Sequence, residues 1–468
     1  MFRKFVDREF ERSFLEERYG SGEFELVVIY GRRRFGKTEL IKNFVKGKPH
    51  LYFLCDRAGT ERNARRLKAA VAMHLGEPEM ETTDLREIFA RLAKRSAGDR
   101  LVVAIDEFSY LAEKDGAIPS IFQAVADEVL KSTDVFLILC GSSVSMMEKG
   151  VLSRASALYG RKTGHIRLGQ LPFAAFGDFY PGNDLAKNVE FHAAVGGIPF
   201  YMERFSDRKS AIENIREQVL ERDGHLYEEI DFLLREEMRE PDVYKGILSA
   251  IEEGRTKVVE IANRTGIRVQ DMDKYLKVLI RLGFVRKETP ATEPRGKRSL
   301  YAIDDNFVST FFRFVEPFKS ELEIGSTKAA VRRLERDFDS HAGRSFERLV
   351  REEVVPRTGM IRAGRIGRWW GHQRDPESGE RREMEIDILA IDESERAILF
   401  GECKWSDGVD GVRLLGELRD KANFVNWKRR REHFLLVSRS FKRVPGESEA
   451  RCLDLEDISE LFDMAGRQ

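Results

Sequence analysis

A glycine-rich segment near the N-terminus constrains the fold of this chain of 468 residues more than any other feature. It follows an apolar run at residues 26–30, whose β-branched side chains predict one buried parallel strand. Residues 31–38 then fit the pattern G-x-x-x-x-G-K-[ST], and residues 39–45 predict a helix. A strand, a glycine loop and a helix in this order are typical of an α/β domain with a parallel sheet.

The spacing within residues 31–38 suits the binding of a nucleotide phosphate. Gly31 lets the chain leave the strand sharply, and Gly36 lets backbone N–H groups approach phosphate oxygens at the positive end of a helix. We expect Lys37 to reach the β- and γ-phosphates of ATP and Thr38 to hold Mg²⁺. The expected nucleotide-binding residues are Gly31, Arg32, Arg33, Arg34, Phe35, Gly36, Lys37, Thr38 and Glu39. For the three arginines, a contact with phosphate or a partner and a solvated position both stay open.

Two further apolar runs end in polar residues. Residues 101–105 predict a strand that is followed by Asp106 and Glu107. We expect this strand to lie beside the strand of the phosphate loop, so that Asp106 joins the Mg²⁺ shell and Glu107 acts catalytically by polarising the attacking water. Residues 135–140 predict another buried strand, and Ser142 or Ser143 lies after it, either near the γ-phosphate or in a simple turn.

Five short segments occur in an informative order: residues 31–38, 106–107, 141–143, 158–161 and 196–199. Over roughly residues 1–320, this order resembles the archaeal ATP-binding protein family of AAA type, allied to the origin-recognition and STAND signal-transduction ATPases. The resemblance implies that Arg161 senses or stabilises the γ-phosphate as a catalytic residue, and that Pro199 binds the nucleotide near adenine. It leaves a homo-oligomer and a monomer open.

The middle of the chain predicts a winged helix-turn-helix. Helices are expected at residues 243–252, 258–264 and 269–282, followed by a hairpin from residues 284–287 and 299–303. Six basic and two acidic residues between Arg281 and Arg298 favour contact with phosphates, whereas Asp271 and Asp273 disfavour it. Contact with DNA and a protein–protein joint both stay open.

The C-terminal part contains a second pattern of reactive side chains. Residues 383–391 and 397–405 predict two strands joined by a turn, carrying Asp387 on the first and Glu402 and Lys404 on the second. Because side chains alternate along a strand, Glu402 and Lys404 face the same side. Asp387 and Glu402 offer hard oxygen ligands for Mg²⁺ or Mn²⁺, and Lys404 can position water and stabilise charge at a phosphodiester.

This pattern resembles the PD-(D/E)XK nucleases, with Ile-Asp in place of Pro-Asp. The resemblance implies catalytic roles for Asp387, Glu402 and Lys404 and a further acid on the preceding helix, for which Glu347 is the first choice and Glu352 a weaker one. An exposed charged hairpin is the alternative. Taken with the two preceding parts, the chain resembles archaeal proteins that join an AAA-type ATPase to a domain of unknown function 234. A basic, aromatic segment at residues 362–372 suits nucleic acid or the covering of a hydrophobic edge.

Composition limits the functions that fit. Lys and Arg total 80 and Asp and Glu total 80, so a basic surface for nucleic acid must be local. The charged N-terminus and the lack of a long apolar run argue against a signal peptide and a membrane span. Four widely spaced cysteines, at positions 55, 140, 403 and 452, argue against a zinc site and suit a reducing, cytoplasmic location.

The sequence as a whole predicts an α/β chain with three domains. These are an AAA-type P-loop ATPase with a helical lid (1–235), a winged helix-turn-helix (236–320) and a PD-(D/E)XK nuclease-like domain (321–468). We expect a chain that binds and hydrolyses ATP and whose nucleotide state regulates a Mg²⁺-dependent DNA nuclease. The alternative is a nucleotide-dependent switch or scaffold that binds DNA or protein without cleavage. DNA is the expected partner, no membrane is expected, and a homo-oligomer or an accessory protein stays open.

Overall fold

The computed structural model describes residues 5–95, 100–293, 298–374 and 381–465, and the chain forms two compact units. The first unit comprises Met1–Leu171 together with Ile198–Phe200, and the second comprises Pro172–Gly197 and Tyr201–Gln468. The chain therefore leaves the first unit after residue 171, returns to it for three residues, and leaves it again.

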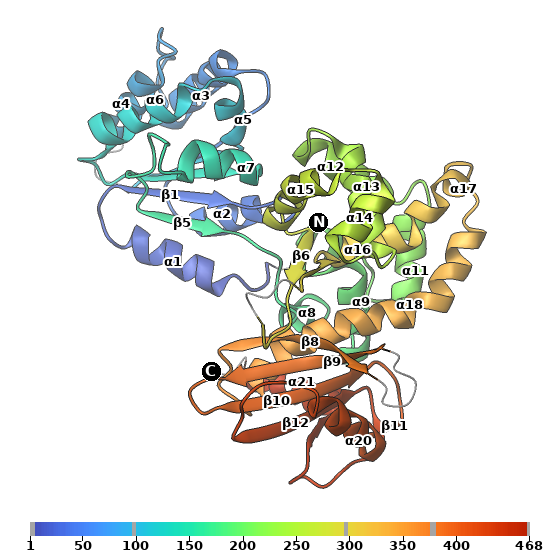
Figure 1. Ribbon diagram of the computed structural model, residues 1–468. Coiled ribbons are helices and arrows are strands. Elements are labelled where there is room, and N and C mark those ends of the chain that lie inside the picture. The colour runs from blue at the N-terminus through green and yellow to red at the C-terminus, as the bar shows by residue number, and fades with distance from the viewer. Residues whose placement is uncertain (1–4, 96–99, 294–297, 375–380, 466–468) are drawn as a thin grey trace. The chain divides into compact units, whose positions relative to one another are not determined.

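The first unit is built on a parallel sheet with the strand order β2-β3-β4-β1-β5 (Figure 1). Strand β1 (Glu25–Tyr30), which lies between β4 and β5, is buried along its whole length, as its apolar run predicts. The predicted α/β class with a parallel sheet is confirmed. The other strands are β2 (His50–Leu54), β3 (Val102–Asp106), β4 (Phe136–Gly141) and β5 (Gly164–Arg167). Its α-helices are α1 (Glu9–Tyr19), α2 (Lys37–Val45), α3 (Thr60–Leu75), α4 (Leu85–Arg95), α5 (Ser109–Lys114), α6 (Ile118–Ala124) and α7 (Val144–Met147).

One detail of the strand order differs from the expectation. Strand β4 lies between β1 and β3, so the prediction that the strand of Asp106 lies beside the strand of the phosphate loop was wrong. All three strands are apolar and fully buried, and such runs contain no local signal for which neighbour each strand takes.

The second unit begins with helices and a small hairpin. Three consecutive helices and two antiparallel strands follow the predicted order, with ends that differ from the prediction by a few residues. They are α13 (Pro241–Glu252), α14 (Val258–Thr265), α15 (Val269–Arg281), β6 (Val285–Glu288) and β7 (Leu300–Ile303). Three more helices pack against one another, α9 (Leu185–Val195), α16 (Asn306–Phe314) and α18 (Lys328–Leu349). No helix of the described residues combines the length and apolar character that a membrane crossing needs.

The C-terminal end of the second unit holds a five-stranded mixed sheet with the order β14-β12-β10-β9-β8 (Figure 1). Strands β9 (Arg381–Asp392) and β10 (Ala397–Lys404) form the predicted antiparallel pair, and helix α20 (Gly411–Ala422) packs on both. Beyond α20, β12 (Arg431–Ser438) pairs in parallel with β10, and β14 (Arg451–Leu453) pairs in parallel with β12.

The basic, aromatic segment before the hairpin is a strand that the sequence did not predict. Strand β8 (Arg365–Arg374) pairs antiparallel with β9. Its side chains Trp369 and Trp370 are only 5% and 8% exposed, and Trp369 belongs to the hydrophobic core of this sheet. Because buried indoles cannot stack on bases, the tryptophans cover the sheet, which is the second of the two interpretations left open for this segment.

Two buried histidines join α9, α16 and α18. His192 lies within 3.4 Å of the side chains of Asn306 and Ser345, and His341 Nε2 donates a hydrogen bond of 2.9 Å to the carbonyl oxygen of Ala193. Burial, together with the charge of neighbouring arginines, lowers the pKa of each histidine to about 3. Both imidazoles are therefore neutral at physiological pH.

We expect the second unit to lose stability as the pH falls below about 6.5. A histidine with a pKa near 6.5 in the unfolded chain and about 3 in the folded chain binds more protons when unfolded. The free energy of unfolding then falls by about 1.4 kcal/mol per pH unit for each histidine, or about 2 kcal/mol for each between pH 6.5 and 5.

Tryptophan fluorescence measures this effect selectively, because all four tryptophans, Trp369, Trp370, Trp405 and Trp427, belong to the second unit. Urea midpoints at pH 7 and pH 5 give the pH dependence of wild type. His341→Gln, whose amide can still donate to Ala193, is expected to show a weaker dependence. His225→Gln is the control, because His225 is exposed in the same unit. Equal wild-type midpoints at the two pH values would contradict the lowered pKa values of His192 and His341.

Candidate functional sites

The first site lies in the first unit, where β1 passes into α2. Gly31 has φ +154°, and a Cβ added there would lie 2.3 Å from the carbonyl oxygen of Leu168, so only glycine fits. Gly36, with φ +86°, precedes α2. The buried Lys37 donates hydrogen bonds of 2.9 Å to the carbonyl oxygens of Gly31 and Arg32. The loop thus folds around the ammonium group of its own lysine.

Asp106 meets this loop although its strand is not adjacent to β1. Thr38 Oγ1 donates a hydrogen bond of 2.8 Å to Asp106 Oδ2, which brings together the two residues expected to hold Mg²⁺. Tyr52 of β2 also donates to Asp106 Oδ2, at 2.7 Å. Burial, together with Asp106, raises the pKa of the Tyr52 hydroxyl, so it remains a donor. The sequence analysis missed Tyr52, and the only signal for it is its polar group in an otherwise apolar strand.

Glu107 is held by the end of the neighbouring strand. Its carboxylate oxygen Oε2 accepts hydrogen bonds from the backbone N–H of Ser142, at 3.2 Å, and from Ser142 Oγ, at 2.7 Å. Glu107 also adopts φ +52°, a conformation that side-chain-bearing residues rarely take. The turn after β3 is therefore shaped to direct this carboxylate toward Ser142.

The three arginines of the loop each contact an aromatic side chain. Arg32 is 3% exposed and lies over the ring of Phe35, and Arg33 donates to the hydroxyl of Tyr110. The guanidinium of Arg34 lies 3.8 Å from the ring centre of Phe200. Contacts within the protein thus hold the three guanidinium groups, and their contact with phosphate stays a prediction.

The remaining residues expected at this site lie as follows. Pro199 contacts the loop, since its Cγ lies 3.8 Å from the Cβ position of Gly36. Glu39, in the first turn of α2, forms an ion pair of 3.0 Å with Lys42. Arg161 forms an ion pair of 3.0 Å with Asp127. These contacts bring Pro199 to the phosphate loop and hold the guanidinium of Arg161 at an acidic partner outside that loop.

The second site lies on the hairpin of β9 and β10. The register pairs Gly401 with Ile388, and Asp387 and Glu402 are the next residues on the two strands. Lys404 Nζ lies 3.2 Å from Glu402 Oε2 and 3.7 Å from Asp387 Oδ2. The sequence therefore located two carboxylates and the lysine whose ammonium group the fold brings close to both of them.

Glu347 joins this group from α18. Burial raises its pKa to about 7, and the negative charge of Asp387 raises it as well. Burial and Asp387 also raise the pKa of Glu402. Although burial opposes it, Asp387 and Glu402 raise the pKa of the Lys404 ammonium, so it stays charged. The negative charge of the other predicted acid, Glu352, instead raises the pKa of Arg286 and of Arg348.

A second lysine, which the sequence analysis missed, contacts one of these acids. Lys421 of α20 lies 2.6 Å from Glu402 Oε1, so the two lysines occupy both oxygens of a carboxylate that is 1% exposed. No group of three or more His, Cys, Asp or Glu side chains is arranged around a metal position within the described ranges. The donor set still suits a hard cation, because carboxylates crowded enough to raise each other's pKa gain from a nearby positive charge.

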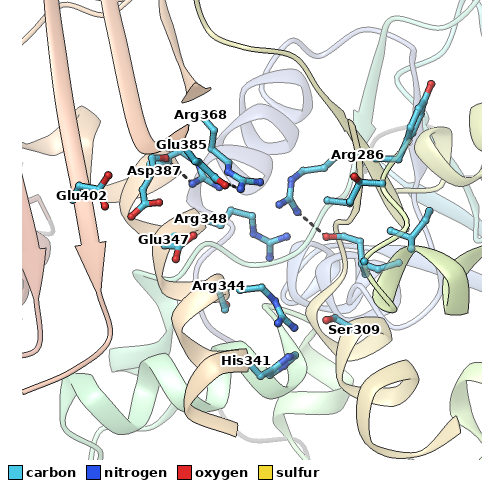
Figure 2. Close-up of a pocket in the computed structure, with 18 of the residues that line it drawn as sticks. Arg286, Ser309, His341, Arg344, Glu347, Arg348, Arg368, Glu385, Asp387 and Glu402 are labelled. Atoms are coloured by element: carbon cyan, nitrogen blue, oxygen red, sulfur yellow. Dashed lines mark hydrogen bonds and ion pairs between the residues drawn. The ribbon is translucent and has the colours of Figure 1, made fainter. Parts of the chain in front are cut away.

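A pocket of about 840 Å³ opens beside the acids (Figure 2). Asp387, Glu402 and Glu347 gather on one side of it, and arginines from α18 and from strands β6 and β8 lie across from them. The arginines that line it are Arg286, Arg344, Arg348, Arg351 and Arg368. The pocket is therefore polarised, with an acidic end and a basic end.

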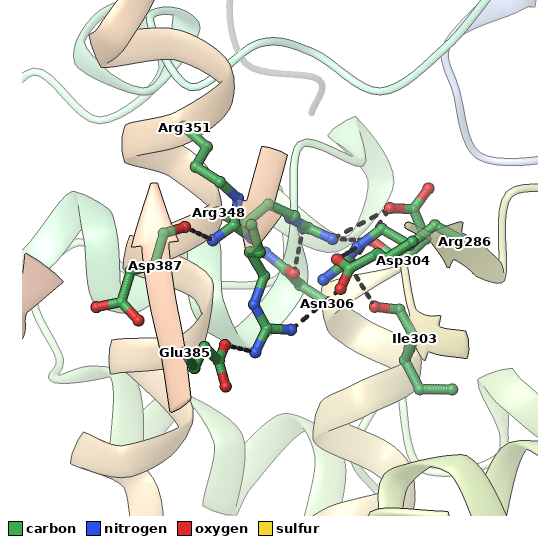
Figure 3. A network of polar contacts seen from close by, with 10 residues as sticks. Arg286, Ile303, Asp304, Asn306, Arg348, Arg351, Glu385 and Asp387 are labelled. Atoms are coloured by element: carbon green, nitrogen blue, oxygen red, sulfur yellow. Dashed lines mark hydrogen bonds and ion pairs between the residues drawn. The ribbon is translucent and has the colours of Figure 1, made fainter. Parts of the chain in front are cut away.

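A network of polar contacts holds the basic end in place (Figure 3). Arg351 donates to the backbone carbonyl of Asp387 at 2.9 Å, and Arg348 donates to Asp304 and Asn306. Burial lowers the pKa of both guanidinium groups, and neighbouring arginines contribute to the shift.

Comparison with known proteins agrees with the two-part organisation. A family described as an ATPase domain predominantly from Archaea matches residues 5–205, and a family of archaeal and bacterial proteins of unknown function, DUF234, matches residues 311–418. An uncharacterized protein of Methanocaldococcus jannaschii is 33% identical over 465 residues, which cover 97% of this chain and 100% of that protein. The chain belongs to this archaeal family of ATPases with a C-terminal DUF234 domain.

Two further relatives of this ATPase concern its N-terminal part. An uncharacterized ATP-binding protein of the same organism is 48% identical over 44 residues, which cover 9% of this chain and 75% of that protein. The Walker-type ATPase of Pyrococcus abyssi aligns with a TM-score of 0.52 at 20% identity, covering 67% of this chain and 97% of that one. This likeness shows the fold. The predicted family and the predicted P-loop ATPase fold are thus confirmed.

Proposed function

We propose that this ATPase hydrolyses ATP at the loop of residues 31–38 and that its nucleotide state regulates a metal-dependent DNA nuclease in its C-terminal domain. We also propose the domain limits 1–235, 236–320 and 321–468, with a winged helix-turn-helix in the middle. The observation that carries the nuclease assignment is the meeting of Asp387 and Glu402 at one lysine, Lys404, beside the pocket.

In the ATP site, the role of each residue follows from its position. Lys37 lies where it can exchange its backbone partners for the β- and γ-phosphates, while Thr38 and Asp106 would hold Mg²⁺. Mg²⁺ neutralises charge that develops on the phosphates. Glu107 orients the attacking water after release from Ser142, which makes this serine a switch for the catalytic carboxylate.

In the C-terminal site, Asp387 and Glu402 would hold Mg²⁺ or Mn²⁺, which supplies Lewis-acid activation of a water molecule and of the scissile phosphate. Lys404 stabilises negative charge on the phosphodiester. Glu347, which lines the same pocket, would accept a proton from the attacking water.

The position of Tyr52 leads to a prediction for the ATP site. Tyr52→Phe removes one of the two side-chain donors to Asp106 Oδ2 without changing the ring. We expect the Mg²⁺ concentration for half-maximal ATP hydrolysis to rise by about tenfold, because partners that orient metal ligands typically contribute about 10- to 100-fold. Tyr19→Phe is the control, since the Tyr19 hydroxyl donates to the backbone of Arg100. Unchanged Mg²⁺ dependence would show that Tyr52 does not position Asp106.

The proposed function is tested by incubating the protein with linear, supercoiled and single-stranded DNA in Mg²⁺ or Mn²⁺. Parallel reactions contain ATP, a non-hydrolysable analogue, ADP or no nucleotide. Metal-dependent cleavage that changes with the nucleotide supports the proposal. Cleavage at the same rate in all four nucleotide conditions would reject the regulation but keep the nuclease. ATP hydrolysis without cleavage of any DNA would favour the alternative, a nucleotide-dependent switch or scaffold.

A further inference from the structure

The hairpin of β6 and β7 is joined to the C-terminal sheet by specific contacts. Glu288 of β6 forms an ion pair of 3.0 Å with Arg368 of β8, and the Ala291 N–H donates to the carbonyl oxygen of Arg368 at 2.9 Å. Arg298 donates to the carbonyl oxygen of Trp370 at 3.2 Å. Positive charge from Arg286 and Arg368 holds the pKa of the Glu288 carboxyl at about 2, although its burial opposes this shift.

Some of the basic residues expected to contact phosphates on this hairpin have partners within the protein instead. Arg286 is directed inward, to Glu288 at 2.6 Å and to the carbonyl oxygen of Ile303 at 2.7 Å, and Arg298 pairs with Glu293. Arg295 and Lys297 lie outside the described residues. The hairpin therefore forms a wall of the pocket that contains the acids, with Arg286, Tyr301 and Ile303 as lining residues.

The size of the pocket selects among nucleic acids. A volume of about 840 Å³ lies within the usual range of about 300–1,000 Å³ for sites that enclose one small ligand. A site of this size encloses one or two nucleotides of a single strand rather than a segment of paired duplex.

The charge distribution selects the orientation of such a strand. Arg348 and Arg351 are at most 8% exposed and support the basic end from behind, whereas the side chain of Arg368 is 24% exposed and its buried Nε has no hydrogen-bond partner among the described residues. Arg344, with a side chain 47% exposed, lies at the solvent side and pairs with Glu252 at 3.0 Å. An anionic backbone suits this end and a cation suits the acids opposite.

We propose that the pocket between the hairpin and the acidic group binds a single strand of DNA, whose phosphates contact Arg344 of α18 and Arg368 of β8. This inference rests on the proposed nuclease function for its biological sense. The hairpin excludes duplex DNA from the acids, so duplexes reach them only at single-stranded ends, flaps or gaps. Arg344, at the entrance, contacts a phosphate adjacent to the one that meets the acids.

Binding without cleavage tests this inference independently of nuclease activity. Fluorescence anisotropy is measured in EDTA with a labelled single-stranded 20-mer and with the matching blunt duplex. We expect the single strand to bind at least about tenfold more tightly than the duplex. Arg344→Ala should weaken single-strand binding by about tenfold and lower the dependence of log affinity on log salt by about 0.7. Arg344→Lys should recover part of the loss.

The matched control is Arg332→Ala, because Arg332 is an exposed arginine on the same helix that is not part of the pocket. Duplex binding as tight as single-strand binding, or equal affinities of Arg344→Ala and wild type, would overturn the inference. Neither outcome bears on whether the protein cuts DNA. Conversely, selective and Arg344-dependent binding of a single strand by a protein that cuts no DNA would reject the nuclease and keep the binding site.

Discussion

Lys37→Ala is expected to slow ATP hydrolysis by about 100- to 1,000-fold, the usual cost of removing one charge-stabilising donor from an active site. Lys37 is 6% exposed, and its ammonium donates hydrogen bonds to the carbonyl oxygens of Gly31 and Arg32. Among the described residues no carboxylate forms an ion pair with Lys37, so phosphate oxygens brought to the loop meet a cation that is not already neutralised. Alanine removes that charge and leaves the two carbonyl oxygens facing the phosphates.

Lys46→Ala is the matched control, because Lys46 is an exposed lysine immediately after the same helix. Hydrolysis should be measured as phosphate release at saturating ATP, with nucleotide affinity determined separately. If the regulatory proposal holds, Lys37→Ala also removes the effect of ATP on DNA cleavage. Hydrolysis at the wild-type rate in Lys37→Ala would show that another site in the preparation turns over ATP.

Lys404→Ala is expected to reduce DNA cleavage by about 1,000-fold or more. It removes the ammonium that lies within 3.7 Å of both Asp387 and Glu402, so negative charge on the phosphodiester loses its partner. The two carboxylates also lose the charge that separates them, which raises the pKa of Glu402 further. Lys404→Arg is informative because a guanidinium keeps the charge but not the compact geometry, so only partial activity is expected.

Lys442→Ala is the control for this experiment, since Lys442 is an exposed lysine in the same domain. Cleavage is followed on single-stranded DNA in Mg²⁺, and ATP hydrolysis is measured in parallel to show that the first unit is intact. Equal cleavage by wild type and Lys404→Ala would place the nuclease activity elsewhere. Loss of both activities would indicate damage to the fold instead.

The sequence predicted what local patterns encode. The glycine loop, the strand before Asp106 and the alternation of Glu402 and Lys404 are each set within about ten residues, and the structure contains the strands and helices that they predict. The pairing of Asp387 with Glu402 was also accessible, because one short turn joins their strands.

Contacts between distant segments were not accessible. Tyr52 reaches Asp106 and Lys421 reaches Glu402 only through sheet order and helix packing, which no periodicity records. Strand β8 was missed because arginine and glycine interrupt the alternation around its tryptophans. Arg286 points inward because its guanidinium forms ion pairs with Glu288 and Asp304 once the hairpin is joined to β8.

The discontinuous second unit limits how such a protein can be rearranged by recombination. Helix α9 lies before Gly197, within the range that the ATPase family matches, yet its carbonyl groups pair with His341 and Thr310 in the second unit. Residues 198–200, which follow it, belong to the first unit. A crossover at either family boundary would divide a hydrophobic core, and one placed before Pro172 would carry Pro199 away from its phosphate loop. We therefore expect the two units to be exchanged together rather than as interchangeable cassettes.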